Sequence, residues 1–140
     1  IASENDRVFE SENRIYRPIM TDQLLLKQLM TILFDNAIKY TEEDGKIEFL
    51  VHCTDRHLYL TVSDNGIGIS ATDKKKIFDR FYRVDKARTR QKGGFGLGLS
   101  LAKQIVDSLR GTITVKDNKP RGTIFEVKIA IQSPSKRKNR

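Results

Sequence analysis

Two segments separated by only three residues, 46–53 (KIEFLVHC) and 57–64 (HLYLTVSD), alternate apolar and polar side chains along their length. A period of two is typical of β-strands that bury one face, and the short polar connection between the segments predicts an antiparallel hairpin. Residues 112–117 and 122–131 alternate in the same way and predict a second hairpin. A chain with two such hairpins must build most of its core on a sheet.

Two longer segments have the periodicity of amphipathic helices. The first spans residues 22–40, with Asp22 placed as its N-cap, and the second spans 97–109, with Gly111 placed as a C-cap glycine. Helices that interleave with hairpin-connected strands predict an α+β fold, a two-layer sandwich in which the helices cover one face of a mixed, mostly antiparallel sheet. The less regular regions are predicted as two short strands over 7–19 with a turn near 11–13, a short helix over 72–80, and a glycine-rich loop over 86–96.

The composition is that of one folded domain followed by a basic tail. The chain has 140 residues, of which 38% are hydrophobic and 31% are charged, and this is enough for a single apolar core. We expect the domain to cover residues 1–131 and the basic segment 132–140 to be disordered. Cys53 is the only cysteine, which excludes an internal disulfide and fits a reducing compartment.

The apolar runs in the sequence are too short to cross a membrane, and the polar first ten residues do not resemble a signal peptide. Because the sequence does not begin with Met, we expect it to be a piece of a longer chain. A membrane segment of that longer chain would lie outside this piece.

The formal net charge of +8 would suit an acidic partner such as nucleic acid. Part of the positive charge lies in residues 74–92 and part in the tail, 132–140. Aromatic residues are not interleaved with these charges as they are in base-stacking surfaces. Nucleic-acid binding is therefore the weakest of the functions considered, and we expect no nucleic-acid partner.

Three polar side chains fall on faces that should be buried. Asn36 shares the apolar stripe of the first helix with Ile32 and Leu33, whereas Asp64 and Thr123 fall on the inward faces of their strands. Each has an ordinary explanation: an amide bonded to neighbouring backbone, a strand that ends in an Asx turn, or a hydroxyl satisfied by its surroundings. A buried polar group without a partner costs about 1–3 kcal/mol, so all three predict partners inside the protein or in a ligand.

A glycine-rich stretch leads directly into the second predicted helix, with Gly93, Gly94, Gly96 and Gly98 close together. Exposed backbone amides at a helix N-terminus form an anion site, typically for phosphate. The spacing matches neither the dinucleotide-binding fingerprint nor the P-loop. An inward-facing acid suits the polar edge of a base, and a glycine-rich loop suits phosphates. An Asn and a Lys suit the charge of a metal ion and of phosphate, so the combination predicts a nucleoside triphosphate site.

Four motifs, in their order and spacing, resemble the nucleotide-binding boxes of bacterial sensor histidine kinases. They are NAIKYT at 36–41, DNGIGI at 64–69, IFDRFYRVD at 77–85 and GGFGLGLSLAKQIV at 93–106, within a resemblance that covers roughly residues 15–131. The resemblance implies the Bergerat α/β sandwich, which is shared with gyrase-type ATPases. It also implies a catalytic, ATP-binding domain that transfers the γ-phosphoryl group to a histidine on a separate dimerisation hairpin, from which a response regulator receives it.

The resemblance further implies roles for individual residues. Asn36 would coordinate a Mg²⁺ ion that bridges the phosphates, Lys39 would contact phosphate, and Tyr40 would pack near the adenine. Asp64 would accept a hydrogen bond from the adenine amino group, with support from Thr123.

The remaining implied contacts come from loops and from the start of the second helix. Gly66 and Gly68 would let the chain approach the base, and Arg83 would reach the γ-phosphate. Residues of about 70–96 would form an ATP lid packed by an aromatic box, although Phe78 and Phe81 also suit an ordinary core. The residues implied to pack the lid or line the nucleotide are Ile69, Phe78, Phe81, Tyr82, Gly94, Gly96, Leu97, Gly98 and Leu99.

The sequence departs from the family at Ile32. In the wider ATPase family an acid one turn before Asn36 activates water, and many histidine kinases have Asn at that position. Isoleucine cannot act as a general base, which favours transfer to an external acceptor over hydrolysis. The only histidines, His52 and His57, lie on strands without a helical acidic context, so we expect both to be surface residues and the acceptor histidine to lie outside this chain.

Three other functions are weighed against a histidine kinase. A gyrase- or chaperone-like ATPase is disfavoured by Ile32, an anti-sigma serine kinase by the sequence FDRFYRVD, and a nucleotide sensor without catalysis by the intact Asn36, Lys39 and Asp64. The expected partners are ATP, the dimerisation hairpin of the same kinase and a response regulator. We expect the chain itself to be monomeric and not inserted in the membrane, as the cytoplasmic domain of a bacterial cell-membrane protein.

Overall fold

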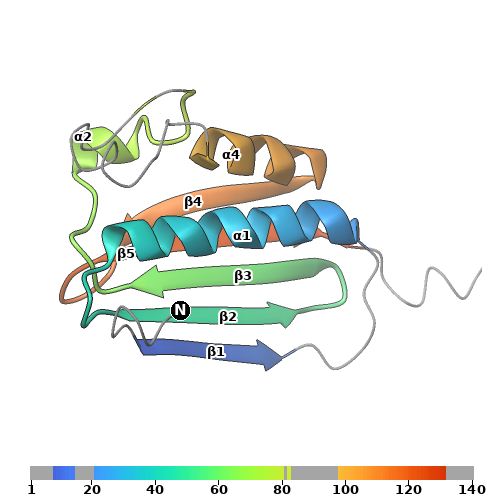
Figure 1. Cartoon of the computed structure of the whole chain (residues 1–140). Helices are drawn as coiled ribbons and strands as arrows, with labels where there is room; N and C mark the ends of the chain where they lie inside the picture. The colour runs from blue at the N-terminus through green and yellow to red at the C-terminus, as the bar shows by residue number, and fades with distance from the viewer. Residues whose placement is uncertain (1–7, 15–20, 81, 83–97, 132–140) are drawn as a thin grey trace, which may run out of the picture.

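The computed structural model describes residues 8–14, 21–80, 82 and 98–131 of the chain (Figure 1). Within them a five-stranded sheet is packed against helices. In chain order the elements are β1 (Val8–Arg14), α1 (Gln23–Tyr40), β2 (Lys46–Cys53), β3 (His57–Asp64), α2 (Ala71–Lys74), α4 (Gly98–Ser108), β4 (Gly111–Asp117) and β5 (Thr123–Ala130).

The strands follow the order β1-β2-β3-β5-β4, and every neighbouring pair is antiparallel except β1 with β2, which is parallel. Figure 1 shows α1 and α4 side by side on one face of this sheet. The predicted α+β sandwich, with a mixed and mostly antiparallel sheet, is therefore confirmed. The two predicted hairpins are β2–β3 and β4–β5.

Strand β1 corrects one expectation. The sequence predicted two short strands and a turn over 7–19, whereas residues 8–14 form one continuous strand in register with 46–52. The polar residues that suggested a turn belong to an edge strand, which pairs on one side only and tolerates polar and charged side chains.

Helix α1 follows its sequence signals closely. The Asp22 carboxylate caps the N-terminus by accepting a hydrogen bond from the Leu25 N–H at 3.0 Å. The helix buries Leu29, Leu33 and Ala37 against the sheet. The core lies between the helices and the sheet, and its most buried apolar strand residues are Ile47 of β2, Leu58, Leu60 and Val62 of β3, and Phe125, Val127 and Ile129 of β5.

Two predicted helix ends are wrong. The left-handed residue after α4 is Arg110, with φ of 58°, and Gly111 is instead the first residue of β4. A Cβ atom at Gly111 would lie 2.3 Å from the carbonyl oxygen of Lys128, so this glycine is required by the close approach of β5. Helix α2 covers only 71–74 instead of 72–80, because the chain after it tightens into turns such as Lys76 N–H to Asp73 carbonyl and buries Ile77.

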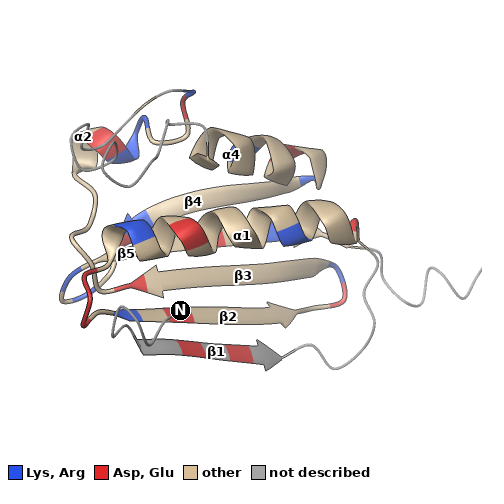
Figure 2. Ribbon diagram, in the orientation of Figure 1, with Lys and Arg blue, Asp and Glu red and all other residues tan. Residues whose placement is uncertain are grey.

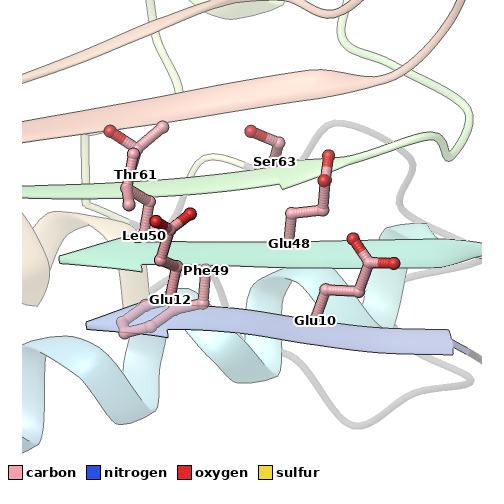
Figure 3. Close-up of a pocket in the computed structure, with 7 residues that line it drawn as sticks. All are labelled: Glu10, Glu12, Glu48, Phe49, Leu50, Thr61 and Ser63. Carbon is pink, nitrogen blue, oxygen red and sulfur yellow. The ribbon is translucent and has the colours of Figure 1, made fainter. Parts of the chain in front are cut away.

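Charged side chains lie on the face of the sheet away from the helices, and Figure 2 shows charged residues on β1 and near the start of β2. There Lys46 pairs with Glu10 at 3.2 Å and with Glu48 at 3.7 Å. His52 lies on this outer face, as predicted, and stacks on Tyr59 with 4.8 Å between the ring centroids. Figure 3 shows a hollow on the same face, lined by Glu10, Glu12, Glu48, Phe49, Leu50, Thr61 and Ser63.

Among the helices of the described residues, none combines the length and the apolar character that crossing a bilayer requires. The predicted loop over 86–96 and the tail 132–140 lie outside the described residues.

Candidate functional site

The site is built around a carboxylate at the end of β3. Alternation along the strand turns Asp64 toward the helices, and the side chain is 3% exposed. Its Oδ1 accepts a hydrogen bond from the Gly66 N–H at 2.9 Å. Burial raises the pKa of Asp64 from 3.8 to about 6, while hydrogen bonds from the N–H groups of Gly66 and Thr123 act to lower it. Burial therefore dominates, and the carboxylate has fewer partners than its charge demands.

The bond between Asp64 and Gly66 is the Asx turn that the sequence allowed as an ordinary explanation. It accounts for the position of one carboxylate oxygen. It does not account for a buried acid whose pKa lies well above that of an exposed Asp. The geometry therefore combines a structural role, the turn, with an acceptor that is left under-satisfied.

Thr123 lies directly opposite Asp64 in the register of β3 and β5. It is 2% exposed, and within the described residues its hydroxyl oxygen has no hydrogen-bond partner. A buried hydroxyl in this state destabilises the fold by about 1–3 kcal/mol. Two under-satisfied polar side chains that share one edge of the core are typical of a site for a polar ligand.

The last turn of α1 forms a second wall. Tyr40 is buried, whereas Asn36 and Lys39 are half-buried. The buried face of α1 is centred on Leu33 and Ala37, so Asn36, which the sequence placed within the apolar stripe, lies at the edge of the buried face. An amide at the edge of a buried face can meet both the protein and a ligand.

Gly66 brings the turn after β3 against the end of α1. The Ile67 N–H donates to the Tyr40 carbonyl at 3.1 Å, and a Cβ atom at Gly66 would lie 1.9 Å from that carbonyl oxygen. Only glycine allows this contact. Gly68 follows with φ of 78°, and Ile69 is buried. The turn thereby joins the Asp64 carboxylate to the α1 wall.

The start of α4 lies beside α1. Gly98 is the first residue of α4 and is exposed, and a Cβ atom there would lie 3.7 Å from the Ile32 side chain. Leu99 is half-buried. The N-terminus of an eleven-residue helix favours anions, so the apolar Ile32 stands next to the place where a phosphate would be attracted.

The described part of the predicted lid is held by side chains. Phe78 packs edge-on against Phe125 with ring centroids 6.3 Å apart. Phe78 is therefore part of the core, which the sequence allowed as its ordinary role. The Tyr82 hydroxyl donates to the Asp73 carboxylate. The remaining predicted residues, Phe81, Arg83, Gly93, Gly94, Gly96 and Leu97, lie outside the described residues.

Sequence reasoning missed two residues that touch the site. The Asn118 amide donates to the main-chain carbonyl of Asp64 at 2.8 Å. Gly122, with φ of 115°, packs so closely that a Cβ atom would lie 1.9 Å from the same carbonyl oxygen. The composition of residues 117–122 (DNKPRG) signals a turn, but no local pattern could name its partner 54 residues earlier.

The described residues contain no group of three or more His, Cys, Asp or Glu side chains that could hold a metal ion by themselves. Mg²⁺ in nucleotide sites takes few protein ligands and several oxygens from phosphate and water. A single amide oxygen at Asn36 is compatible with that kind of site, although not with an ion bound by protein alone.

Residues 21–133 match the model of a family described as histidine kinase-, DNA gyrase B-, and HSP90-like ATPase. Among known proteins, sensor protein CiaH of Streptococcus pneumoniae is 84% identical over 99% of this chain, and signal transduction histidine-protein kinase ArlS of Staphylococcus aureus is 44% identical over 72% of it. The matched parts are 31% of the length of CiaH and 22% of that of ArlS.

Solved structures agree with this match. The mycobacterial sensor histidine kinase MprB superposes with a TM-score of 0.78 at 27% identity, covering 94% of this chain and 88% of its own. Histidine kinase ThkA, in a complex with response regulator protein TrrA, superposes with a TM-score of 0.74 at 26% identity, covering 96% of this chain and 36% of its own.

Proposed function

Because this chain belongs to the family of histidine kinase-, DNA gyrase B- and HSP90-like ATPases, we propose that it is the ATP-binding catalytic domain of a sensor histidine kinase. The observation that carries the proposal is the pair formed by Asp64 and Thr123, a buried acid and a buried hydroxyl in need of polar partners. An adenine ring offers one edge with a donor amino group and adjacent acceptor nitrogens. Asp64 accepts from the amino group, and the Thr123 hydroxyl donates to a ring nitrogen.

The phosphates lie between the last turn of α1 and the start of α4. Lys39 supplies positive charge from α1, and the N–H groups at the start of α4 supply the donors. Asn36 is the residue that would hold Mg²⁺, which neutralises phosphate charge when it is bound. Arg83, Gly94 and Gly96 complete this set in the proposal as residues that contact phosphate.

The reaction proposed is transfer of the γ-phosphoryl group to a histidine on a dimerisation hairpin outside this chain. Ile32 beside Gly98 places a hydrocarbon side chain where a base for water activation would have to stand. His52 is stacked on Tyr59 on the opposite face of the sheet, so it is not placed to accept phosphate. The domain positions the nucleotide and neutralises its charge, and the acceptor supplies the nucleophile.

The partners proposed follow from the relatives. One solved structure of ThkA is a complex with a response regulator, and CiaH is a sensor protein. We therefore infer that a response regulator takes the phosphoryl group from the hairpin histidine. The chain would then be the cytoplasmic part of a membrane-bound sensor, monomeric once it is separated from its hairpin.

The test is transfer of labelled γ-phosphate from ATP, with this chain supplied in trans to the dimerisation hairpin of the same full-length kinase. Free phosphate is measured in parallel, and an Asp64→Asn variant is the matched control. Label on the hairpin histidine with little free phosphate is the expected result. Tight ATP binding without label on the histidine, even when the hairpin is covalently linked, would mean that the chain is a nucleotide sensor and not a kinase. Rapid phosphate release would indicate an ATPase.

A further inference from the structure

The turn between β4 and β5, residues 118–122, belongs to none of the four motifs, yet it contacts the peptide of Asp64 from two sides. The Asn118 side-chain N–H donates to the Asp64 carbonyl at 2.8 Å, and Gly122 is pressed against the same carbonyl. The Asn118 main-chain N–H closes the turn by donating to the Gly122 carbonyl at 3.0 Å. One carbonyl group of the site is therefore held by both ends of a single turn.

The orientation of the Asn118 amide is fixed by a second bond. Its Oδ1 accepts from the Lys119 N–H at 2.9 Å, which leaves the NH₂ group directed at Asp64. The turn is also anchored from outside the sheet, because Asp117 pairs with Lys74 of α2 with 2.5 Å between Oδ1 and Nζ. The ion pair next to Asn118 thus connects the β4–β5 hairpin to α2.

We propose that Asn118 is a positioning residue for the nucleotide site: its amide fixes the peptide of Asp64, so that the carboxylate stays buried beside Thr123 and aimed at the bound base. This inference rests on the proposed function. Asp64 is the last residue of its strand, and a buried main-chain carbonyl needs a hydrogen-bond partner. Asn118 supplies that partner from a segment 54 residues away.

Few other groups set the protonation of Asp64. Among the described residues, its pKa responds to burial first and then to the N–H groups of Gly66 and Thr123, with no charged side chain contributing. Lys46 on the neighbouring strand faces outward, where it pairs with Glu10. A looser turn would admit water to the carboxylate and lower its pKa, so the pH dependence of nucleotide binding reports on the turn.

The experiment measures ATP and GTP affinity by calorimetry between about pH 5 and pH 8 for the wild-type chain, Asn118→Ala and Asn118→Asp, with thermal unfolding as the check of folding. Lys119→Gln is the matched control, since within the described residues the Lys119 side chain forms no hydrogen bond or ion pair and only its main-chain N–H contacts Asn118. We expect Asn118→Ala to bind ATP about fivefold more weakly, the scale of one hydrogen bond, and to lose part of its preference over GTP. The midpoint of its titration, meaning the pH at which ATP affinity is halfway between its low-pH and high-pH values, should lie below that of the wild type.

Asn118→Asp keeps the acceptor for Lys119 but removes the donor, so it should weaken ATP binding at pH 8 and, through its added charge, raise the pH midpoint. Folded variants that keep the affinity and the midpoint of the wild type would overturn the inference while leaving the proposed function in place. A wild-type chain that fails to bind ATP would overturn both. If the Asn118 variants unfold, Asp117→Asn decides, because a loosened turn should still lower the midpoint, and an unchanged midpoint contradicts the inference.

Discussion

The two ends of β3 point their side chains into the same core but have opposite chemistry. At one end Leu58 and Leu60 are 1% exposed and have apolar neighbours on β2 and β5. At the other end Asp64 is 3% exposed and faces Thr123, whose hydroxyl is unpartnered within the described residues. Burial stabilises the fold at the first end and destabilises it at the second, which is expected where the missing partner is a ligand.

The largest expected effect is at the apolar end. Leu60→Ala removes a fully buried side chain and should lower the free energy of unfolding by about 3 kcal/mol, because it leaves a cavity between sheet and helices. Denaturant unfolding measures the loss. The ATP affinity of the folded fraction should stay within about twofold of wild type, and a large change would show that the two ends are not separate.

The polar end should respond in the opposite direction. Asp64→Asn removes the buried charge, so we expect the free energy of unfolding at pH 7.5 to rise by about 2 kcal/mol. ATP binding should weaken by about 2 kcal/mol, because the amide no longer provides a charged acceptor. Calorimetric binding and denaturant unfolding of the same preparation test both signs, and a variant that loses both stability and affinity would contradict the comparison.

The same group predicts a pH dependence. Burial raises the pKa of Asp64 from 3.8 to about 6, so between these values the folded chain keeps a proton that the unfolded chain has released. The stability difference between Asp64→Asn and wild type should therefore be greatest above about pH 6 and shrink as the pH falls toward about 4. ATP affinity should weaken as the pH falls through about 6. Unfolding curves of both chains across this range provide the measurement, and a difference independent of pH would exclude the buried charge as its cause.

The smallest effect is expected at Thr123. Thr123→Val replaces the hydroxyl, which has no partner in the part of the chain that the structure describes, by a methyl group of similar volume, so the free energy of unfolding should rise by about 1 kcal/mol. ATP affinity should fall by a similar amount, since the base loses one hydrogen bond. Thr114→Val, at an exposed position of β4, serves as the control for β-propensity. Equal changes in stability at both positions would mean that the Thr123 hydroxyl has no special role.

Local patterns were enough to predict much of the fold and the centre of the site. The alternation of β3 placed Asp64 inward, and Asp22 marked the start of α1, because burial and capping depend on residues a few positions apart. The same reasoning failed where a distant segment decides the outcome. Strand β1 is continuous because β2 pairs with it. Gly111 is required because the Lys128 backbone of β5 approaches it closely, and it does not cap a helix.

By itself, then, the sequence determined that β3 and β5 each bury one face and that Asp64 and Thr123 lie on those faces, since both follow from the period of each strand and the chemistry of each residue. Only the tertiary structure decided what holds these polar groups in place. Gly66 meets the end of α1, and Asn118 reaches the Asp64 carbonyl across 54 residues. Such contacts join segments whose separation in the chain carries no local signal, and they form only once the sheet has brought the strand ends together.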